Sequence, residues 1–366
     1  MKKYLIPNTG KFYKANLHSH TTCSDGKLTP EIAKAEYMKR GYSIVAFTDH
    51  EAFVTHNDLK DENFLPLNGF EFTIEEIEKP FWRAKSTHIG FIALRDDIEL
   101  HPLWDRNISA CLSNCVHLVK FDESKPDYKK VPTAEGINEA MKIGREAGFF
   151  VTYNHPTWSR NGYEEYIQFE HMNAMEIYNH CSVVGGYDED NCPQVYADFL
   201  NKGKRIFCTA TDDNHNKTNE FESAWCDSFG GYTMIKADSL NYNAVGKALE
   251  QGHFYCSNGG PEIYEVFVDD EDQTINFTFS NAVKVVGQTK NRAHWTVYPA
   301  KNYDFPLFGG EYPVDKNDRD YLTKIKIPLV LEREYIRLTL HGENGKVTYT
   351  NAYFIDEIFE KYFNKK

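Results

Sequence analysis

The sequence predicts an α/β domain, folded as a barrel, followed by a small antiparallel β-sandwich domain. Three observations indicate this. Short apolar runs alternate with helical patterns up to about residue 259, polar residues follow those runs, and from residue 260 onward polar and apolar residues alternate. Repeated β-α units of this length favour a closed barrel over an open sheet. We therefore expect residues 1–259 to form the barrel and residues 260–366 to form an all-β domain.

The predicted elements of the barrel follow one another along the chain. Thr29 followed by Pro30 is typical of a helix start, and Gly41 suits the end of that helix. The apolar run 43–47 then predicts a buried parallel strand. The same reasoning predicts strands at 65–72, 87–94, 149–153, 174–178, 205–209, 232–235 and 253–256, and helices at 133–147, 194–201 and 239–250.

The C-terminal part is recognised by strict alternation of apolar and polar residues. This alternation occurs at 274–279, 324–327 and 337–340, and predicts half-buried strands. Asn344-Gly345 is a strong signal for a β-hairpin between two such segments. The stretch 95–132 fits neither pattern, and we expect either an insertion over the barrel mouth or a surface excursion.

Composition limits the classes of function. The chain has 366 residues, 41% of them hydrophobic, and a formal net charge of −13. This charge argues against an extended nucleic-acid partner or an anionic membrane surface. No apolar run has the length of a signal peptide or a membrane span, and the scattered cysteines are expected to be thiols. We therefore expect a cytoplasmic protein, and the sequence leaves its oligomeric state open.

Residues that can bind metal ions gather at the predicted strand ends. His18 and His20 are two positions apart, so an extended backbone directs both imidazoles to one side. Singly, each histidine would more readily be an ordinary strand or turn residue, but their common placement favours ligands. The set is His18, His20, Asp25, His50, Glu71, His88, His155, Asp213 and His215. One zinc ion takes about four ligands, so the set predicts two or three ions, bridged by a carboxylate such as Glu71 or Asp213.

The order of these motifs resembles the PHP superfamily, named for polymerase and histidinol phosphatase domains. The motifs are His-x-His followed by Ser-Asp-Gly, then Thr-Asp-His, Gly-Phe-Glu, a lone His, Asn-His-Pro and Asp-x-His, within about residues 16–259. The resemblance implies a distorted (β/α)7 TIM-like barrel with a two- or three-metal site at the C-terminal ends of its strands. Its spacing favours Asp213 over Asp212 as a ligand. The β domain weakly resembles C-terminal modules of some two-domain members.

The resemblance also implies a function. It predicts a metal-dependent hydrolase that cleaves phosphoester bonds of a small phosphorylated metabolite or nucleotide, through a hydroxide bridging Mn, Zn or Fe ions. Asp49 would orient a ligand, or serve as a capping or solvated acid. Arg160 and Lys217 follow ligand motifs and would bind the substrate's phosphate, or be ordinary surface charges.

Two other functions are compatible with parts of the sequence. An amidohydrolase-like metal enzyme also begins with His-x-His and would cleave a C–N bond with one or two metals, but the size of the ligand set, and Asp25 in particular, favours the phosphoesterase. A non-enzymatic protein that binds a glycan or a partner protein would be expected to have lost ligands, and none is missing from the set.

Overall fold

The computed structural model describes residues 1–76, 79, 83–107, 114–217, 220–290, 294–299, 302–303 and 314–363. Within these residues the α-helices are α1 (Pro30–Met38), α2 (Ala134–Glu146), α3 (Tyr163–Tyr166), α4 (His180–Val184), α5 (Pro193–Asn201), α6 (Tyr242–Glu250) and α7 (Ile355–Phe363). The 3₁₀ helices are η1 (Asn57–Leu59), η2 (Val116–Leu118), η3 (Asp188–Asp190) and η4 (Leu331–Arg333). None of the described helices combines the length and apolar character needed to cross a membrane.

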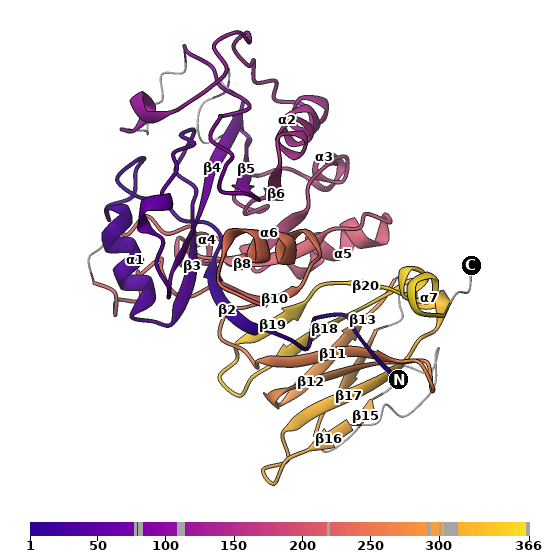
Figure 1. The fold of residues 1–366 in the computed structure, drawn as a ribbon. Helices are drawn as coiled ribbons and strands as arrows, with labels where there is room; N and C mark the ends of the chain where they lie inside the picture. Colours follow the sequence, from indigo (N-terminus) through magenta and orange to yellow (C-terminus); the bar gives the residue numbers. More distant parts are fainter. Residues whose placement is uncertain are drawn as a thin grey trace.

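The strands divide between two sheets (Figure 1). The smaller sheet has the order β1 (Lys2–Tyr4), β11 (Ile263–Asp269), β12 (Thr274–Ala282), β17 (Leu322–Pro328) and β16 (Val314–Lys316). The larger sheet has the order β15 (Asn302–Tyr303), β14 (Trp295–Val297), β13 (Lys284–Gln288), β18 (Tyr335–His341), β19 (Val347–Thr350), β10 (Phe254–Ser257), β9 (Tyr232–Ala237), β2 (Lys11–Asn16), β3 (Tyr42–Phe47), β4 (Leu65–Glu75), β5 (Ser86–Ala93), β6 (Phe149–Tyr153), β7 (Ala174–Asn179) and β8 (Phe207–Thr211), with β20 (Tyr353–Phe354) paired to β18.

The N-terminal part of the larger sheet carries the predicted α/β pattern. Strands β2, β3 and β4 are parallel to one another, and so are β6, β7 and β8. Strand β5 is antiparallel to both β4 and β6, because no helix lies between β4 and β5 in the described residues. The α/β class is therefore confirmed, but this hairpin interrupts the strict β-α alternation that the sequence suggested.

The described strand ladders do not close this part of the sheet into a barrel. Strand β8 lies against β9, where Thr233 Oγ1 donates to the Ala210 carbonyl (3.2 Å), yet the ladders form an open path from β9 to β8. An isolated parallel bridge between Ser19 and Asn214 joins the segments that follow β2 and β8. The predicted (β/α)7 barrel is thus not confirmed as a closed ladder, although β9 and β8, the two ends of this path, lie against each other.

Two sheets pack against each other in the C-terminal part. Phe277 and Ile325 of the smaller sheet share one buried cluster with Val285 and Leu338 of the larger sheet. Strands β18 and β19 are antiparallel neighbours across the Asn344-Gly345 turn, in which Gly345 has a φ of +75°. The left-handed conformation suits glycine, so the hairpin forms where the sequence predicted it.

Both sheets cross the predicted domain boundary. Strand β1, from the start of the chain, pairs with β11, and β19, from its end, pairs with β10 (Figure 1). The division at residues 259 and 260 stays a prediction, because these pairings join the two parts along their strands. Helix α7 was not predicted, and it packs its apolar face on the C-terminal core through Ile355, Ile358 and Phe359.

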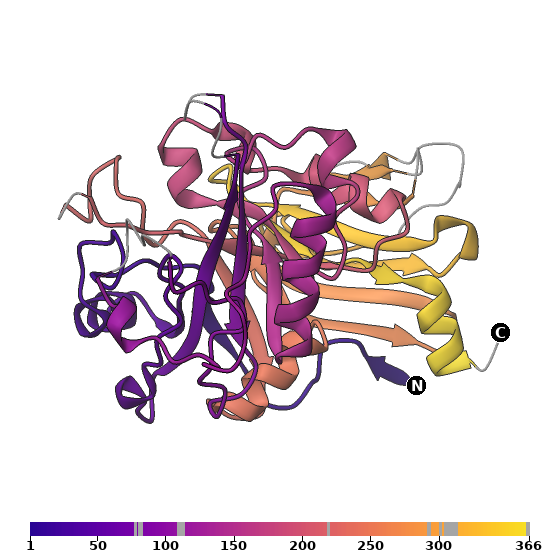
Figure 2. The ribbon, with the colours of Figure 1, turned by 90° about the horizontal axis from the view of Figure 1, so that it is seen from above.

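The helices begin where the capping signals lie. Thr29 accepts a hydrogen bond from Ile32 N (3.4 Å) at the start of α1, and Asn241 accepts one from Ala244 N (2.9 Å) at the start of α6. Figure 2 shows α2 along one face of the β4–β6 region. Every residue of β6 is buried, which explains its apolar run without alternation.

Candidate metal centre

The nine predicted ligands lie together at one edge of the larger sheet. His18 and His20 follow β2, Asp25 precedes α1, His50 follows β3, Glu71 lies in β4, His88 in β5, His155 after β6, and Asp213 and His215 after β8. The C-terminal ends of parallel strands share an edge. Because β5 runs the opposite way, its beginning, with His88, reaches the same edge. All nine are buried except Asp25, whose side chain is 28% exposed.

Glu71 stands at the centre of this cluster. Its Oε1 lies 3.2 Å from His18 Nε2, 3.1 Å from His88 Nδ1 and 3.2 Å from His155 Nε2. Its Oε2 lies 3.2 Å from His50 Nδ1 and 3.5 Å from His20 Nε2. One carboxylate therefore faces five imidazoles, three through one oxygen and two through the other.

Two further carboxylates complete the cluster. Asp213 Oδ1 lies 2.9 Å from His20 Nε2 and 3.2 Å from His18 Nε2. Asp25 Oδ1 lies 3.4 Å from His215 Nε2 and 3.8 Å from His50 Nε2. Ligand atoms of His20, Asp25, His50 and His215 all lie within 4.8 Å of one another, and so do those of His18, His20, Glu71 and Asp213. His20 belongs to both groups, so the two positions adjoin.

The first two histidines converge because their backbone is held extended. His20 N donates to the Asn214 carbonyl (3.0 Å), Asp213 N donates to the His18 carbonyl (2.9 Å), and Thr48 N donates to the Ser19 carbonyl (2.9 Å). With neighbours on both sides, residues 18 and 20 face the same way and their Nε2 atoms are 3.1 Å apart. This is the geometry expected from their spacing.

Glu176, in the middle of β7, was not predicted. Its carboxylate is buried and accepts hydrogen bonds from His18 Nδ1 (2.8 Å), His155 N (2.8 Å) and Thr211 Oγ1 (2.6 Å). With Nδ1 donating, His18 presents Nε2 to Glu71 and Asp213, which is how a carboxylate orients a metal-binding imidazole. The one signal in the sequence was a carboxylate inside an otherwise apolar strand.

Three more buried acids hold the loops that carry the ligands. Asp49 accepts hydrogen bonds from the backbone and side chains of Thr21 and Ser24, so it holds the turn between His20 and Asp25 and not His50 itself. Asp190 accepts from the amides of residues 157 and 158 in the loop after His155, and Asp227 from those of residues 215 and 216. Neither Asp190 nor Asp227 was predicted from the sequence.

Asp212 and Asp213 have separate tasks. Asp212 turns away from the cluster and accepts hydrogen bonds from Tyr37 OH (2.7 Å) and the amides of residues 229–231. Asp213 faces the histidines from a left-handed backbone with a φ of +55°, and His155 also has a positive φ, +23°. Non-glycine residues in this region store strain, which is commonest at functional sites.

The cluster shifts the pKa values of its members. Burial raises the pKa of Glu71, but His88 and His18 outweigh burial and hold it well below its usual value. Burial and His88 lower the pKa of His50 to about 4, against the opposing effect of Glu71. Burial disfavours the charged form of His155, yet Glu71 and Asp213 raise its pKa to about 9. Glu71 and His50 thus already have the protonation states that bind a cation, whereas His155 must lose a proton to do so.

The donor set fits divalent cations. Six buried polar atoms of the cluster form no hydrogen bond, and five of them lie within ion-pair distance of another member of the cluster, which leaves them available to a cation. They are Asp25 Oδ1, His50 Nδ1, Glu71 Oε2, His88 Nδ1, His155 Nδ1 and Asp213 Oδ1. Imidazole and carboxylate are the ligands of Zn, Mn and Fe in proteins. The cluster can therefore bind divalent metal ions.

Both predicted substrate contacts are exposed. Lys217 lies two positions after His215, whose Nδ1 is 3.8 Å from Cys181 Sγ. Arg160 is exposed after the loop that carries His155, and its side chain makes no hydrogen bond or ion pair with another described residue. The Trp158 ring packs on His88 and His155, with ring centres 4.7 and 4.9 Å apart, and so forms one wall of the cluster.

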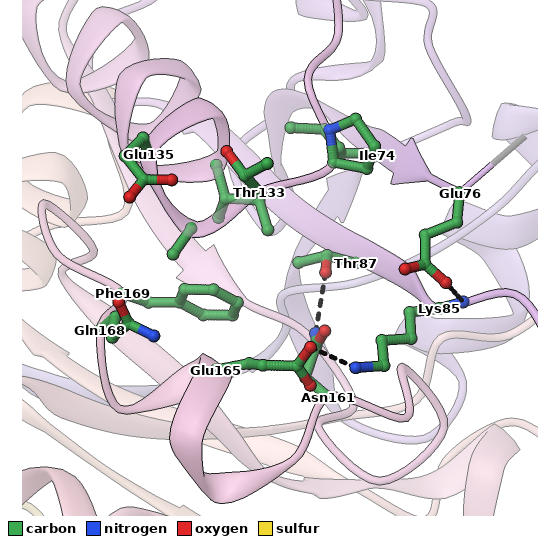
Figure 3. Close-up of a pocket in the computed structure, with 13 residues that line it drawn as sticks. Ile74, Glu76, Lys85, Thr87, Thr133, Glu135, Asn161, Glu165, Gln168 and Phe169 are labelled. Atoms are coloured by element: carbon green, nitrogen blue, oxygen red, sulfur yellow. Dashed lines mark hydrogen bonds and ion pairs between the residues drawn. The ribbon is translucent and has the colours of Figure 1, made fainter.

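Figure 3 shows a separate pocket, lined by residues that include Thr87, Asn161 and Glu165. None of the nine residues lines it, and Thr87, which does, points away from the face of β5 that carries His88. Asn161 Nδ2 donates to Thr87 Oγ1 (2.8 Å), and Lys85 pairs with Glu165 across the pocket. Because none of the nine predicted ligands lines it, the pocket is separate from the candidate metal centre.

Comparisons with known proteins give distant likenesses only. No family model matches the chain, and no curated protein matches it. One similar solved structure is a two-domain protein containing a predicted PHP-like metal-dependent phosphoesterase from Bacteroides vulgatus ATCC 8482, with 14% identity, 96% of this chain and 98% of that chain covered, and a TM-score of 0.41. The chain is thus similar to a PHP-like protein.

Two other solved structures cover less of the chain. A provisionally assigned metal-dependent phosphoesterase from Bifidobacterium adolescentis ATCC 15703 has 14% identity, 58% of this chain and 90% of that chain covered, and a TM-score of 0.37. An amidohydrolase from Chromobacterium violaceum with bound sulfate and no metal has 16% identity, 55% and 87% coverage, and a TM-score of 0.36. Likenesses with TM-scores below 0.5 add no evidence about activity, which is inferred from the side chains alone.

Proposed function

We propose that this protein is a metal-dependent hydrolase that cleaves phosphoester bonds of a small phosphorylated metabolite or nucleotide. The observation that carries the proposal is the convergence of five histidines on Glu71, within a cluster that has six buried polar atoms without hydrogen-bond partners. One zinc ion takes about four ligands. Nine ligands therefore support two or three ions, and their chemistry suits Mn, Zn or Fe.

The positions of the ligands suggest how the ions would be shared. Glu71 would bridge two of them, because its Oε1 faces His18, His88 and His155 while its Oε2 faces His20 and His50. The group made by Asp25, His50 and His215, joined by His20, would hold an ion at the more exposed side. Asp213 would bind beside His18 and His20.

Charge supports an anionic substrate. Asp25, Glu71, Asp213 and the adjoining Glu176 bring four negative charges, which two divalent ions would balance and three ions, with six positive charges, would exceed. With three ions the loaded centre would therefore be net positive and attract a phosphoryl group. When bound, such ions acidify water and neutralise phosphoryl oxygens. Lys217 would add a positive charge at the rim, and Arg160 is a second proposed phosphate contact.

The protein's own residues would orient and enclose the reacting group. Glu176 fixes the His18 ring so that Nε2 faces the cluster. Trp158 shields His88 and His155 from solvent on one side. Asp49 keeps the turn that carries Asp25 in place through Thr21 and Ser24. Together these contacts preorganise the ligands, which reduces the reorganisation needed during the reaction.

Substrate panels test the proposal. The full chain, loaded separately with Mn, Zn and Fe, is assayed on p-nitrophenyl phosphate, bis(p-nitrophenyl) phosphate and nucleotides, and in parallel on a hydantoin and dipeptide panel. We expect turnover of phosphoesters that is lost on chelation and in His88→Ala. Hydrolysis confined to the C–N substrates would contradict the proposal and favour the amidohydrolase-like alternative.

The Lys217→Ala variant tests whether Lys217 binds the phosphate of the substrate. We expect the KM for the phosphoester to rise about 1.4- to fivefold, which corresponds to the ~0.2–1 kcal/mol typical of exposed charges. Arg160→Ala is the companion variant. If both KM values stay unchanged, neither residue contacts the phosphate, although the metal centre itself would be unaffected by that result.

A further inference from the structure

Asn114, in the stretch 95–132 that follows β5, is hydrogen-bonded to the turn between His20 and Asp25. Asn114 N donates to the Cys23 carbonyl (2.7 Å), and Asn114 Nδ2 donates to the carbonyls of Thr22 (3.1 Å) and Ser24 (3.4 Å). These three bonds attach residue 114 to the turn between His20 and Asp25. Asp49 holds the same turn through Thr21 and Ser24. The position of residues 114 and 115 relative to the turn is therefore well defined.

These hydrogen bonds bring two thiols from distant parts of the chain together. Cys115 Sγ lies 2.7 Å from Cys23 Sγ, although 92 positions separate the two residues. A disulfide bond is about 2.05 Å long, so linking the sulfurs needs only a small approach. Cys23 is buried, 7% exposed, and Cys115 is partly exposed. An oxidant from solvent would therefore reach Cys115 first.

We propose that Cys23 and Cys115 are a redox-modification site, at which hydrogen peroxide forms a reversible disulfide between the stretch 95–132 and the turn between His20 and Asp25. The Cys115 sulfur attacks the peroxide oxygen, giving a sulfenic acid and releasing water. The Cys23 sulfur then attacks the Cys115 sulfur, the S–S bond forms, and a second water leaves with the hydroxyl oxygen. The two thiols lose two electrons and two protons in total, the peroxide takes them up, and a dithiol returns them on reduction.

The link acts on the metal centre through Asp25. Cys23 lies two positions before Asp25 and three after His20, both of which face the same group of ligands. A cross-link to residue 115 restricts the movements of this turn, so the oxidised protein releases metal more slowly than the reduced protein. This consequence rests on the proposed function, whereas formation of the disulfide does not.

A second cysteine pair provides an internal control. Cys208 Sγ and Cys256 Sγ lie 3.8 Å apart, and both residues are completely buried between strands β8 and β10. Proximity alone would allow both pairs to oxidise, but only the Cys23–Cys115 pair has a partly exposed member. Cys111 lies outside the described residues, so the experiments are repeated in a Cys111→Ser background.

Disulfide mapping tests the site directly. The full chain, freed of metal, is treated with hydrogen peroxide, alkylated, digested without reductant and analysed by mass spectrometry. We expect a Cys23–Cys115 linked peptide as the main product, removed by dithiothreitol and absent from Cys23→Ser and Cys115→Ser. Asn114→Ala should slow formation of the disulfide several-fold, because it removes the side-chain hydrogen bonds to Thr22 and Ser24 but leaves both thiols in place. No link, or a main product that joins Cys208 to Cys256, would overturn the proposal.

The rate of metal release tests the effect of the disulfide on the metal centre, separately from whether the disulfide forms. Oxidised and reduced chains are loaded with Mn or Zn and mixed with excess chelator. Slower release after oxidation, with no such difference in Cys115→Ser, supports the link to the metal centre. Equal rates would overturn that link. A chain that binds no metal in either state would overturn the proposed function, while the mapping result still decides the disulfide.

Discussion

The metal centre and the C-terminal two-sheet core are both buried, but for opposite physical reasons. In the centre, imidazoles and carboxylates face one another and six of their buried polar atoms have no hydrogen-bond partner. In the C-terminal core, Phe277, Ile325 and Leu338 pack together and the strands satisfy their backbone groups in ladders. The first arrangement costs stability until a cation binds, and the second supplies stability. Substitutions should therefore separate binding from folding.

The largest expected effect comes from removing the central carboxylate. Glu71→Ala and the isosteric Glu71→Gln should lower phosphoester turnover by several orders of magnitude, because five histidines lose their shared partner. His20→Ala should behave alike. The metal-free chain should still melt cooperatively. Turnover, metal content and thermal melts are the measurements, with Glu75→Gln on the same strand as the control. Wild-type turnover with full metal content in Glu71→Gln would remove the distinction between the two regions.

The next largest effect is expected on the stability of the C-terminal core. Phe277→Ala should lower the free energy of unfolding by about 3–5 kcal/mol, the usual range for a buried Phe truncated to Ala. The folded fraction should keep its metal and its turnover per chain, since Phe277 lies in the C-terminal core. Denaturant unfolding and elemental analysis provide the test, with Thr278→Ala as the neighbouring control. Metal lost from a chain that remains folded would show that the core and the centre are coupled.

A smaller effect is expected from the residue that orients His18. Glu176→Gln should weaken metal binding about 10–100-fold, as removal of a carboxylate that orients a metal-binding imidazole typically does. Chelator competition measures the affinity, and Glu170→Gln, an exposed acid, is the control. An unchanged affinity would mean that the His18 ring holds its position without Glu176.

Features that depend on interactions between residues close in sequence were predicted, whereas features that depend on contacts between distant residues were not. The grouping of the nine predicted ligands could be expected because strand ends place them, and the hairpin at Asn344-Gly345 could be predicted because turn chemistry is local. The direction of β5 was not predicted, since an apolar run indicates a strand but not its orientation. Glu176, Asp190 and Asp227 were missed because each binds groups that are distant in sequence or belong to the backbone.

His101, in the stretch 95–132, allows a further test, which measures how stability depends on pH. Its ring is buried against Phe70, with ring centres 4.1 Å apart, and burial together with Lys130 lowers its pKa to about 3. The unfolded chain takes up a proton near pH 6.5 and the folded chain only near pH 3. The contribution of neutral His101 to the free energy of unfolding is therefore fully present above pH 6.5. It falls as the pH drops, by about 1.4 kcal/mol at pH 5.5.

The matched variant is His101→Asn, whose amide can still accept the hydrogen bond from Leu103 N. Unfolding of both proteins, freed of metal, is measured between pH 7 and pH 5. The loss of stability on acidification should be smaller in the variant by the amount attributed to His101. Equal pH profiles would show that this ring is not buried as the structure describes, and that the inserted stretch is not packed on β4.

The metal stoichiometry tests the central claim most directly. The full chain, expressed with excess Mn, Zn or Fe, is analysed for bound metal, stripped with chelator, and titrated back while hydrolysis of p-nitrophenyl phosphate is followed. We expect two or three ions per chain, with activity lost on stripping and regained only as the second ion binds. A chain that is fully active with one ion or none would contradict it.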